Sequence, residues 1–189
     1  TSKDIFINLM PIGGGFGRRL SADYSAEAMQ VAYHIKKPVQ LMYTREDDMK
    51  FDNYRPASTH ILSAKLGADK KPADWVHKIA IAPVADYLMG MKGNSNWLGM
   101  EAEGGANGDM YYAIPSLRST VSRTQSPLVE GWWRAVNFTY NNVVIECFID
   151  EVAKNAGIDP LEYRLSLLKN QPARKIRGGT PFDPARDRK

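Results

Sequence analysis

The sequence predicts an α+β domain, in which helices are interleaved with the strands of a mixed sheet. Three observations predict it. A short apolar run passes through a glycine-rich loop into a helix-forming segment and a second apolar run, as in a βαβ-like unit. Further on, two alternating segments flank a loop with turn residues, which is typical of a hairpin. Near the carboxyl end, apolar residues at helical spacing indicate a long helix and then a shorter one.

The first unit begins with residues 5–10, an expected buried strand, and continues through the glycine loop of residues 13–17. The helix after the loop is expected to stop before Pro38, because proline cannot continue a helix. Residues 39–43 are the second expected strand of the unit. The helix has three candidate N-cap side chains, Ser21, Asp23 and Ser25.

The middle of the chain begins with residues 44–49, a charged segment that predicts a turn or a short helix. Residues 60–66 and 75–81 are the two arms of the expected hairpin, joined by a loop with turn chemistry. Residues 91–110 are rich in Gly and Asn and show no clear period, so we expect a long loop. Residues 116–123 are a further expected strand.

The late helix is expected to start at Asn137 or Thr139 and to end at Gly157, a favoured C-terminal residue. Asp159 and Pro160 then open the last helix as N-cap and first residue, with Glu162 completing a capping-box-like arrangement. The apolar stripe of the first of these helices comprises Val143, Val144, Cys147, Phe148, Val152 and Ala156. The last helix is expected to bury Leu161, Leu165 and Leu168.

Charge divides the chain into two parts. The 189 residues include 25 Lys or Arg and 21 Asp or Glu, but the basic excess lies in residues 171–189. Residues 1–170 are neutral overall and form the predicted domain, and residues 171–189 form a basic tail rich in Pro and Gly. Binding to nucleic acid needs a clustered basic face, so we expect no nucleic-acid partner.

Other classes of site find little support in the composition. The single cysteine, Cys147, excludes an internal disulfide and is expected to lie in the core. His34, His60 and His77 lack metal-ligand spacing and are expected to be structural or solvated. No run approaches the roughly 18 apolar residues of a membrane span, and no signal peptide is recognisable at the start.

The glycine loop is the first candidate site. Its backbone amides, followed by a helix, could hold an anion. The dinucleotide pattern G-x-G-x-x-G and the P-loop pattern both fail, because position 18 is Arg18. A tight packing turn is the plain alternative, although Phe16 among glycines favours a side chain presented to a ligand.

The second candidate site is the segment of residues 131–137, which contains Trp132, Trp133 and Arg134. Two aromatic rings and a guanidinium in a segment without periodicity could stack on and clamp a planar, anionic ligand. The alternative is a packed aromatic elbow with a surface arginine.

These two segments, in this order, resemble the molybdenum hydroxylases, the family of xanthine dehydrogenase and aldehyde oxidase. The resemblance rests on the glycine-phenylalanine loop, on residues 44–49 and 54–56, and on residues 131–136. Residues 146–151 and 157–160 are similar too. Arginine after the loop makes the chain more similar to the isoquinoline 1-oxidoreductase beta-subunit branch than to the xanthine-type enzymes. The resemblance implies a fold of the molybdenum cofactor-binding domain type.

The resemblance also implies a set of cofactor-binding residues. The glycine loop would lie near the molybdenum end of a molybdopterin cofactor, and backbone around residues 134–136 would contact the cofactor as well. No residue of this chain is expected to bind the metal directly. The implied cofactor-binding residues are Gly13, Gly14, Gly15, Phe16, Gly17, Arg18, Trp133, Arg134, Ala135 and Val136.

The implied activity is hydroxylation of an aldehyde or an N-heterocycle with oxygen from water, in which a glutamate acts as the base. Nothing after Leu168 matches the family's glutamate motif, so we expect residues 1–170 to be part of a molybdopterin-binding domain excised from a larger subunit. Ala135 departs from the serine common in the branch. The isolated piece is expected to carry no cofactor and to be inactive.

The implied partners are the remainder of the large subunit, an iron–sulfur small subunit and a cytochrome c electron acceptor, in the periplasm or cytoplasm of a bacterium. Two alternatives stay open. One is a nucleotide- or flavin-binding module that uses the glycine loop, and the other is an interaction domain without a ligand.

Overall fold

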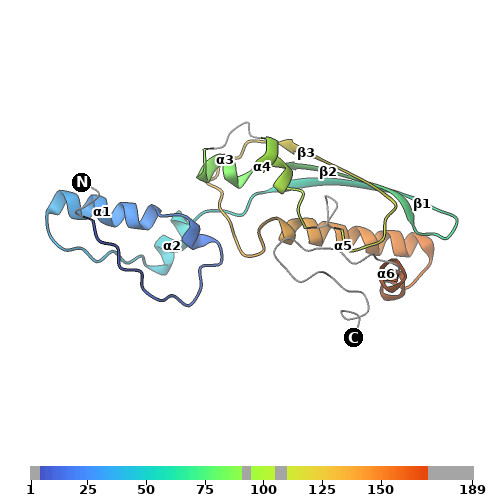
Figure 1. The fold of residues 1–189 in the computed structure, drawn as a ribbon, viewed down its shortest axis with the longest axis horizontal. Helices are drawn as coiled ribbons and strands as arrows, with labels where there is room; N and C mark the ends of the chain where they lie inside the picture. Colours follow the sequence, from blue (N-terminus) through green and yellow to red (C-terminus); the bar gives the residue numbers. More distant parts are fainter. Residues whose placement is uncertain (1–4, 91–94, 105–109, 170–189) are drawn as a thin grey trace.

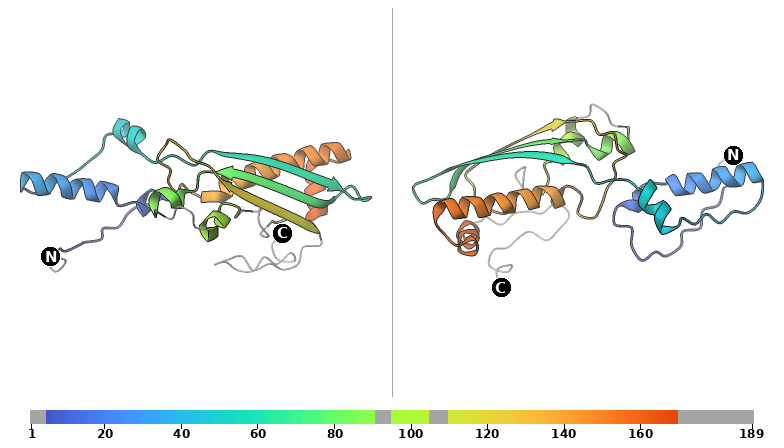
Figure 2. Two further views of the ribbon diagram at one scale, coloured as in Figure 1. Left: turned by 90° about the horizontal axis from the view of Figure 1, so that it is seen from above. Right: turned by 180° about the vertical axis from the view of Figure 1, so that it is seen from behind.

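A computed structural model describes residues 5–90, 95–104 and 110–169. Two parts follow one another along the long axis of the molecule (Figure 1). The amino-terminal part contains the helices α1 (Asp23–Ile35) and α2 (Arg45–Phe51), and the larger part contains a three-stranded sheet with helices against it. Figure 2 shows the long helix α5 (Val136–Ala156) along one face of the sheet. This arrangement confirms the expected α+β class.

The amino-terminal part contains helices but, within the described residues, no strand. Residues 5–10 and 39–43 have no regular secondary structure, so the two predicted strands of a βαβ-like unit are wrong for this structure. A β-strand needs an adjacent strand to which its backbone N–H and C=O groups can hydrogen-bond. Within the described part of the chain, neither segment pairs with another strand. Their apolar side chains are exposed, with Phe6 at 88% and Leu9 at 92%.

The two helices of this part differ in how they begin. The N-cap of α1 is Ala22, which makes no side-chain hydrogen bond, so none of the three predicted caps is used. Thr44 caps α2 in a full capping box with Asp47, which confirms the expected short helix. The 3₁₀ turn Arg18–Leu20 leads from the glycine loop to α1.

The sheet consists of β1 (Ser58–Leu66), β2 (Pro72–Ile81) and β3 (Ser116–Arg123), in the order β1-β2-β3. The pair β1 and β2 is the predicted hairpin and is antiparallel. The pair β2 and β3 is parallel, and this makes the sheet mixed. A parallel pair needs a crossover, and the short helices α3 (Val84–Leu88) and α4 (Ser95–Met100) lie within it.

The helix α4 corrects the prediction that residues 91–110 form one long loop. Residues 91–94 and 105–109 of that segment lie outside the described residues, as does the predicted tail of residues 171–189. Residues 101–104 form turns. The backbone at Gly104 packs closely against the start of α5, because a Cβ on Gly104 would lie 2.7 Å from the Cα of Phe138. Apolar periodicity in the sequence does not reveal such a contact.

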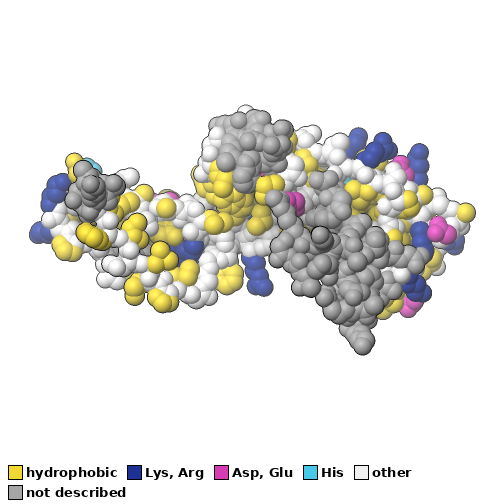
Figure 3. All heavy atoms as spheres, in the orientation of Figure 1, with side chains coloured by type: hydrophobic (Ala, Val, Ile, Leu, Met, Phe, Trp, Pro, Cys, Tyr) yellow, Lys and Arg dark blue, Asp and Glu magenta, His cyan; other side chains and the backbone are white. Residues whose placement is uncertain are grey.

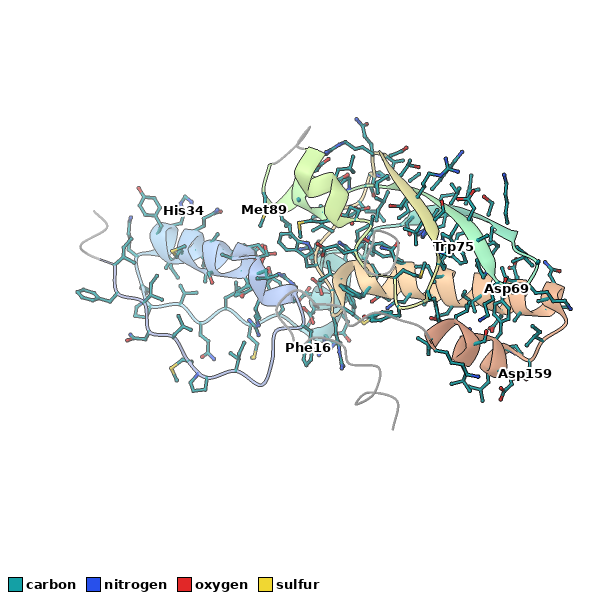
Figure 4. The ribbon with its side chains drawn as sticks, turned by 45° about the vertical axis from the view of Figure 1, so that its right-hand side comes forward. Phe16, His34, Asp69, Trp75, Met89 and Asp159 are labelled. Atoms are coloured by element: carbon teal, nitrogen blue, oxygen red, sulfur yellow. The ribbon has the colours of Figure 1, made fainter. Side chains whose placement is uncertain are left out.

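The core lies between the sheet and α5. Trp75 of β2, labelled in Figure 4, is fully buried. Its ring packs edge-on against that of Phe148, with ring centroids 4.9 Å apart. The predicted stripe of α5 is partly wrong, since Val143 and Cys147 are exposed. Residues that are two positions apart in a helix point in directions about 200° apart. Val143 and Cys147 therefore lie on the side opposite Ile145 and Ile149, which are buried.

The helix α6 (Pro160–Leu168) buries Tyr163 and Leu167, whereas Leu161 and Leu165 of the predicted side are exposed. Tyr163 explains why the buried face of α6 differs from the predicted one, because its hydroxyl donates to the carbonyl of Lys70 at 2.7 Å. Gly157 closes α5 in the left-handed conformation, and Asp159 accepts hydrogen bonds from two amides of α6, as predicted.

Candidate functional site

The two candidate motifs, 115 positions apart, touch through their backbones. A Cβ built on Gly17 would lie 2.0 Å from the carbonyl oxygen of Trp132, closer than any side chain can come. Gly17 also has a φ of 98°, a conformation that L side chains rarely adopt. Glycine at position 17 therefore lets the glycine loop reach the aromatic segment. Figure 4 shows Phe16 of this loop where the two parts of the molecule meet.

A cleft of about 620 Å³ lies at this junction. Gly14, Gly15 and Phe16 form one wall, and Trp132 and Trp133 belong to another. Side chains of α1, α2 and the segments around them complete the lining. The volume falls within the range of about 300–1,000 Å³ found for sites of small molecules and cofactors.

The structure places half of the predicted cofactor residues at this cleft. Its lining includes Gly14, Gly15, Phe16, Arg18 and Trp133. The other five do not line it, and among them Gly17 makes the contact between the motifs. The residues of the predicted set outside the lining are Gly13, Gly17, Arg134, Ala135 and Val136.

The glycine loop has a tightly turned backbone. Phe16 adopts a positive φ of 50°, and the amide of Arg18 donates to the carbonyl of Gly15 at 2.9 Å. The Phe16 side chain remains 65% exposed, and its ring covers Gly14, where a Cβ would lie 2.9 Å from the ring. The loop thus presents an aromatic ring to the cleft over a backbone without side chains.

The guanidinium of Arg18 is held by two carboxylates. It pairs with Asp23 at 2.9 Å and, through Nε, with Asp52 at 2.6 Å. The hydrogen bonds to Arg18 lower the pKa of Asp23. Arg18 therefore joins the loop to α1 and to the end of α2. Arg19 also lines the cleft, with its guanidinium carbon 5.1 Å from the centroid of the Tyr24 ring.

Residues 52–55 run beside the aromatic segment and bind it at several points. The indole nitrogen of Trp133 donates to the carbonyl of Asn53 at 3.0 Å. The amide of Gly131 donates to the carbonyl of Tyr54 at 2.9 Å. Arg55 donates to the carbonyls of Arg134 and Val136, each at 2.9 Å.

Local sequence patterns do not single out residues 52–55. Their one signal in the sequence was the resemblance carried by residues 54–56. An arginine before a proline in a loop gives no indication that its guanidinium binds a backbone about 80 residues away. Such contacts depend on tertiary structure rather than on local pattern.

A second polar cluster is buried beside the start of α5. Tyr140 donates to Glu101 at 2.5 Å and to the Asn137 side chain at 2.7 Å. Burial raises the pKa of Glu101 to about 7. His77 is fully buried and bonded to His60 at 2.8 Å, in keeping with the structural role expected for both. Among the described residues, no three His, Cys, Asp or Glu side chains are grouped to hold a metal ion.

The glycine loop and the aromatic segment border a cleft large enough for a cofactor, an arrangement typical of ligand-binding domains. Comparison with known families agrees with this class. Residues 1–168 match the family described as the molybdopterin cofactor-binding domain. The chain belongs to this family.

Curated relatives share the same stretch of sequence. The chain is 31% identical over 171 residues to a membrane-bound aldehyde dehydrogenase [pyrroloquinoline-quinone] of Gluconacetobacter polyoxogenes, over 85% of the chain and 22% of the relative. It is 25% identical over 174 residues to isoquinoline 1-oxidoreductase subunit beta of Brevundimonas diminuta, over 88% of the chain and 21% of the relative.

A third relative is the aldehyde oxidoreductase molybdenum-binding subunit PaoC of Escherichia coli, 28% identical over 156 residues, which are 82% of the chain and 20% of the relative. The chain thus spans about a fifth of the length of these relatives. In the described residues, no helix combines the length and apolarity needed to cross a membrane.

Proposed function

We propose that this chain forms one wall of the molybdopterin site of an oxidoreductase, which hydroxylates an aldehyde or an N-heterocycle with oxygen from water. One observation carries the proposal. In a domain of this family, the glycine loop and the aromatic segment meet through Gly17 and Trp132 and border a cleft of cofactor size.

The residues present fit such a cofactor. Gly14 and Gly15 leave backbone without side chains at the wall of the cleft, where an anionic group can approach the amides. Phe16 and Trp133 offer aromatic surface to a flat pterin ring. Arg19 adds positive charge at the same cleft. When bound, the molybdenum centre supplies Lewis-acid and redox chemistry.

This chain's own contribution is binding and orientation. The backbone of the glycine loop and of residues 134–136 would hold the cofactor, and Phe16 would narrow access of water to the reacting end. The base of the reaction is proposed to be a glutamate outside the chain, because no residue after Leu168 matches the family's motif.

The proposed partners follow from the size and the names of the relatives. The relative from Brevundimonas diminuta is named as the beta subunit of isoquinoline 1-oxidoreductase, and PaoC is named as a molybdenum-binding subunit. We therefore propose that the remainder of a large subunit completes the site. An iron–sulfur subunit and then a cytochrome c would accept the electrons.

The identity of the cofactor can be tested on the purified full-length polypeptide that contains this chain. Elemental analysis and pterin fluorescence after denaturation are expected to give molybdenum and pterin. The name of the Gluconacetobacter polyoxogenes relative includes pyrroloquinoline quinone, so quinone is measured in parallel. Quinone, flavin or nucleotide in place of pterin, or no ligand at all, would overturn the proposal.

The variant Gly15→Val tests the glycine loop itself. A Cβ at position 15 would lie 3.0 Å from the Cβ and Cγ of Arg19, so a valine must shift the Arg19 side chain at the wall of the cleft. A thermal midpoint close to that of the wild type is the check that the variant still folds. We expect pterin and molybdenum content to fall below the detection limit. Gly99→Val is the matched control, because a Cβ on Gly99 meets nothing within 4 Å. Full molybdenum content in Gly15→Val would contradict the role of the loop.

A further inference from the structure

The turn before α5 has an unfavourable backbone. Ala135 has a φ of 66° and Val136 a φ of 43°, both in the left-handed region. Glycine enters this region freely, whereas a β-branched residue such as valine rarely does. Two such residues in succession persist only where the surrounding structure holds them.

Arg55 makes the contacts that hold this turn. Its two terminal nitrogens donate to the carbonyls of Arg134 and Val136, the residues on either side of Ala135. A planar guanidinium presents its donors in a fixed fork, so it sets the spacing and direction of both carbonyls at once. Bonds within the segment support the same turn. The amide of Val136 donates to the carbonyl of Trp133 at 2.8 Å, the amide of Phe138 to that of Ala135 at 2.9 Å, and the hydroxyl of Thr139 to that of Arg134 at 3.3 Å.

The same stretch of chain also fixes the turn relative to the cleft. Asp52 pairs with Arg18 of the glycine loop, and Asn53 accepts the indole N–H of Trp133. Arg55 then binds the turn that follows Trp133. Residues 52–55 thus connect both walls of the cleft, and within them Arg55 binds the strained backbone.

We propose that Arg55 is a positioning residue of the cofactor site, which acts by holding residues 134–136 in their left-handed conformation. This inference rests on the proposed function, because it assigns a purpose to the turn beside the cofactor cleft. Arg55 does not line the cleft. It acts on the cleft through Trp133, which lines the cleft and directly precedes the turn.

The experiment compares Arg55→Lys with the wild type in the full-length polypeptide. Lysine keeps the positive charge but cannot form the two-pronged contact. The measured quantities are pterin content after purification, the rate at which pterin leaves the protein, and the thermal midpoint. We expect about a tenfold faster loss of pterin, the effect of about one charged hydrogen bond, with a small change in the midpoint. Arg118→Lys on β3 is the control, since Arg118 is exposed and pairs with Asp74 at 3.4 Å.

A second variant separates positioning from general stability. Ala135→Gly removes part of the cost of the left-handed turn, so Ala135→Gly in the Arg55→Lys background is expected to slow pterin loss again. Unchanged pterin loss in Arg55→Lys would overturn the inference. So would pterin loss that only follows a lowered thermal midpoint and that Ala135→Gly does not reverse. Absence of pterin from the wild type would instead overturn the proposed function, so the two failures are distinguishable.

Discussion

Glu101 carries a carboxyl group into the packed region between α4 and α5, where it is only 4% exposed. Tyr140 donates to this carboxyl, and nearby Glu130 and Asp86 add negative charge. Burial favours the neutral form, and it raises the pKa of Glu101 to about 7 from an ordinary value of 4.5. The group is therefore protonated in the folded chain at pH values where it is ionised in the unfolded chain.

This difference predicts a pH dependence of stability with a definite sign. Between pH 4.5 and 7 the unfolded chain loses its Glu101 proton while the folded chain keeps it, so stability falls as the pH rises. The full effect is about 3 kcal/mol by pH 7. Glu101→Gln resembles the protonated form at every pH, and its stability relative to the wild type should rise across this interval. Urea unfolding at pH 4.5, 6 and 7.5 measures this difference.

His77 makes an opposite contribution to the pH dependence of stability, and this contribution cancels when Glu101→Gln is compared with the wild type. Burial and the neighbouring His60 lower the pKa of His77 to about 4, so its contribution to stability is lost as the pH falls below about 6.5. Wild type and Glu101→Gln share this contribution, and it cancels in their difference. A difference that stays constant from pH 4.5 to 7.5 would mean that Glu101 is ionised in the folded protein.

At the scale of single elements, α5 is the helix against which the sheet packs. Phe148 on this helix is partly buried against the core, with its ring edge on Trp75. Phe148→Ala is expected to cost about 3 kcal/mol, the lower end for loss of a large aromatic side chain, because the site is not fully closed. Val143→Ala on the same helix is the control, since Val143 is 58% exposed, and it should cost less than about 0.5 kcal/mol. Equal costs for the two variants in chemical denaturation would contradict the observed helix face.

The elements that sequence reasoning predicted well carry their signals locally. Asp159 and Pro160 mark the start of α6, and the alternation on either side of a turn marks the hairpin of β1 and β2. The face of α5 was harder to predict, because Val143 and Cys147 are apolar but exposed, while Asn137 and Asn141 are polar but buried. These asparagines bond to backbone carbonyls of residues 100–103, which lie 37 to 40 positions away. Periodicity of apolar residues does not contain that information.

The candidate site divides in the same way. The glycine loop and the two tryptophans stand out in the sequence by composition, and the structure brings them together. Asp52, Asn53 and Arg55 do not stand out, because their roles are long-range bonds to residues 18 and 133–136. A resemblance to a family can point to such residues, whereas local physical chemistry cannot.

At the scale of the whole molecule, the amino-terminal part exposes apolar side chains that no other described part of the chain covers. Residues 5–12 have no regular secondary structure, and their apolar side chains are exposed, as are those of Met29 of α1 and Met42 after it. Figure 3 shows hydrophobic side chains distributed over the surface of this part. Exposed apolar side chains in this number within one short segment favour a contact site. A segment of this composition is suited to pack against a further part of the full-length polypeptide. The cleft between the two parts depends on the same region for one of its walls.

These features predict the behaviour of the isolated 189-residue chain. We expect the sheet and α5 to fold, because β2, α5 and α6 bury a common apolar core. On the proposed function we also expect no bound molybdenum, since the chain would supply only part of the site, and no oxidation of aldehydes or N-heterocycles, since the proposed base lies outside the chain. The exposed residues 5–12 should cause self-association, which light scattering after gel filtration measures. The double variant Phe6→Ser and Leu9→Ser should reduce the association, whereas Ile61→Ser, a single exposed position on β1, should not. Elemental analysis and a dye-reduction assay decide the rest, because stoichiometric molybdenum with turnover would show that these residues hold a complete site.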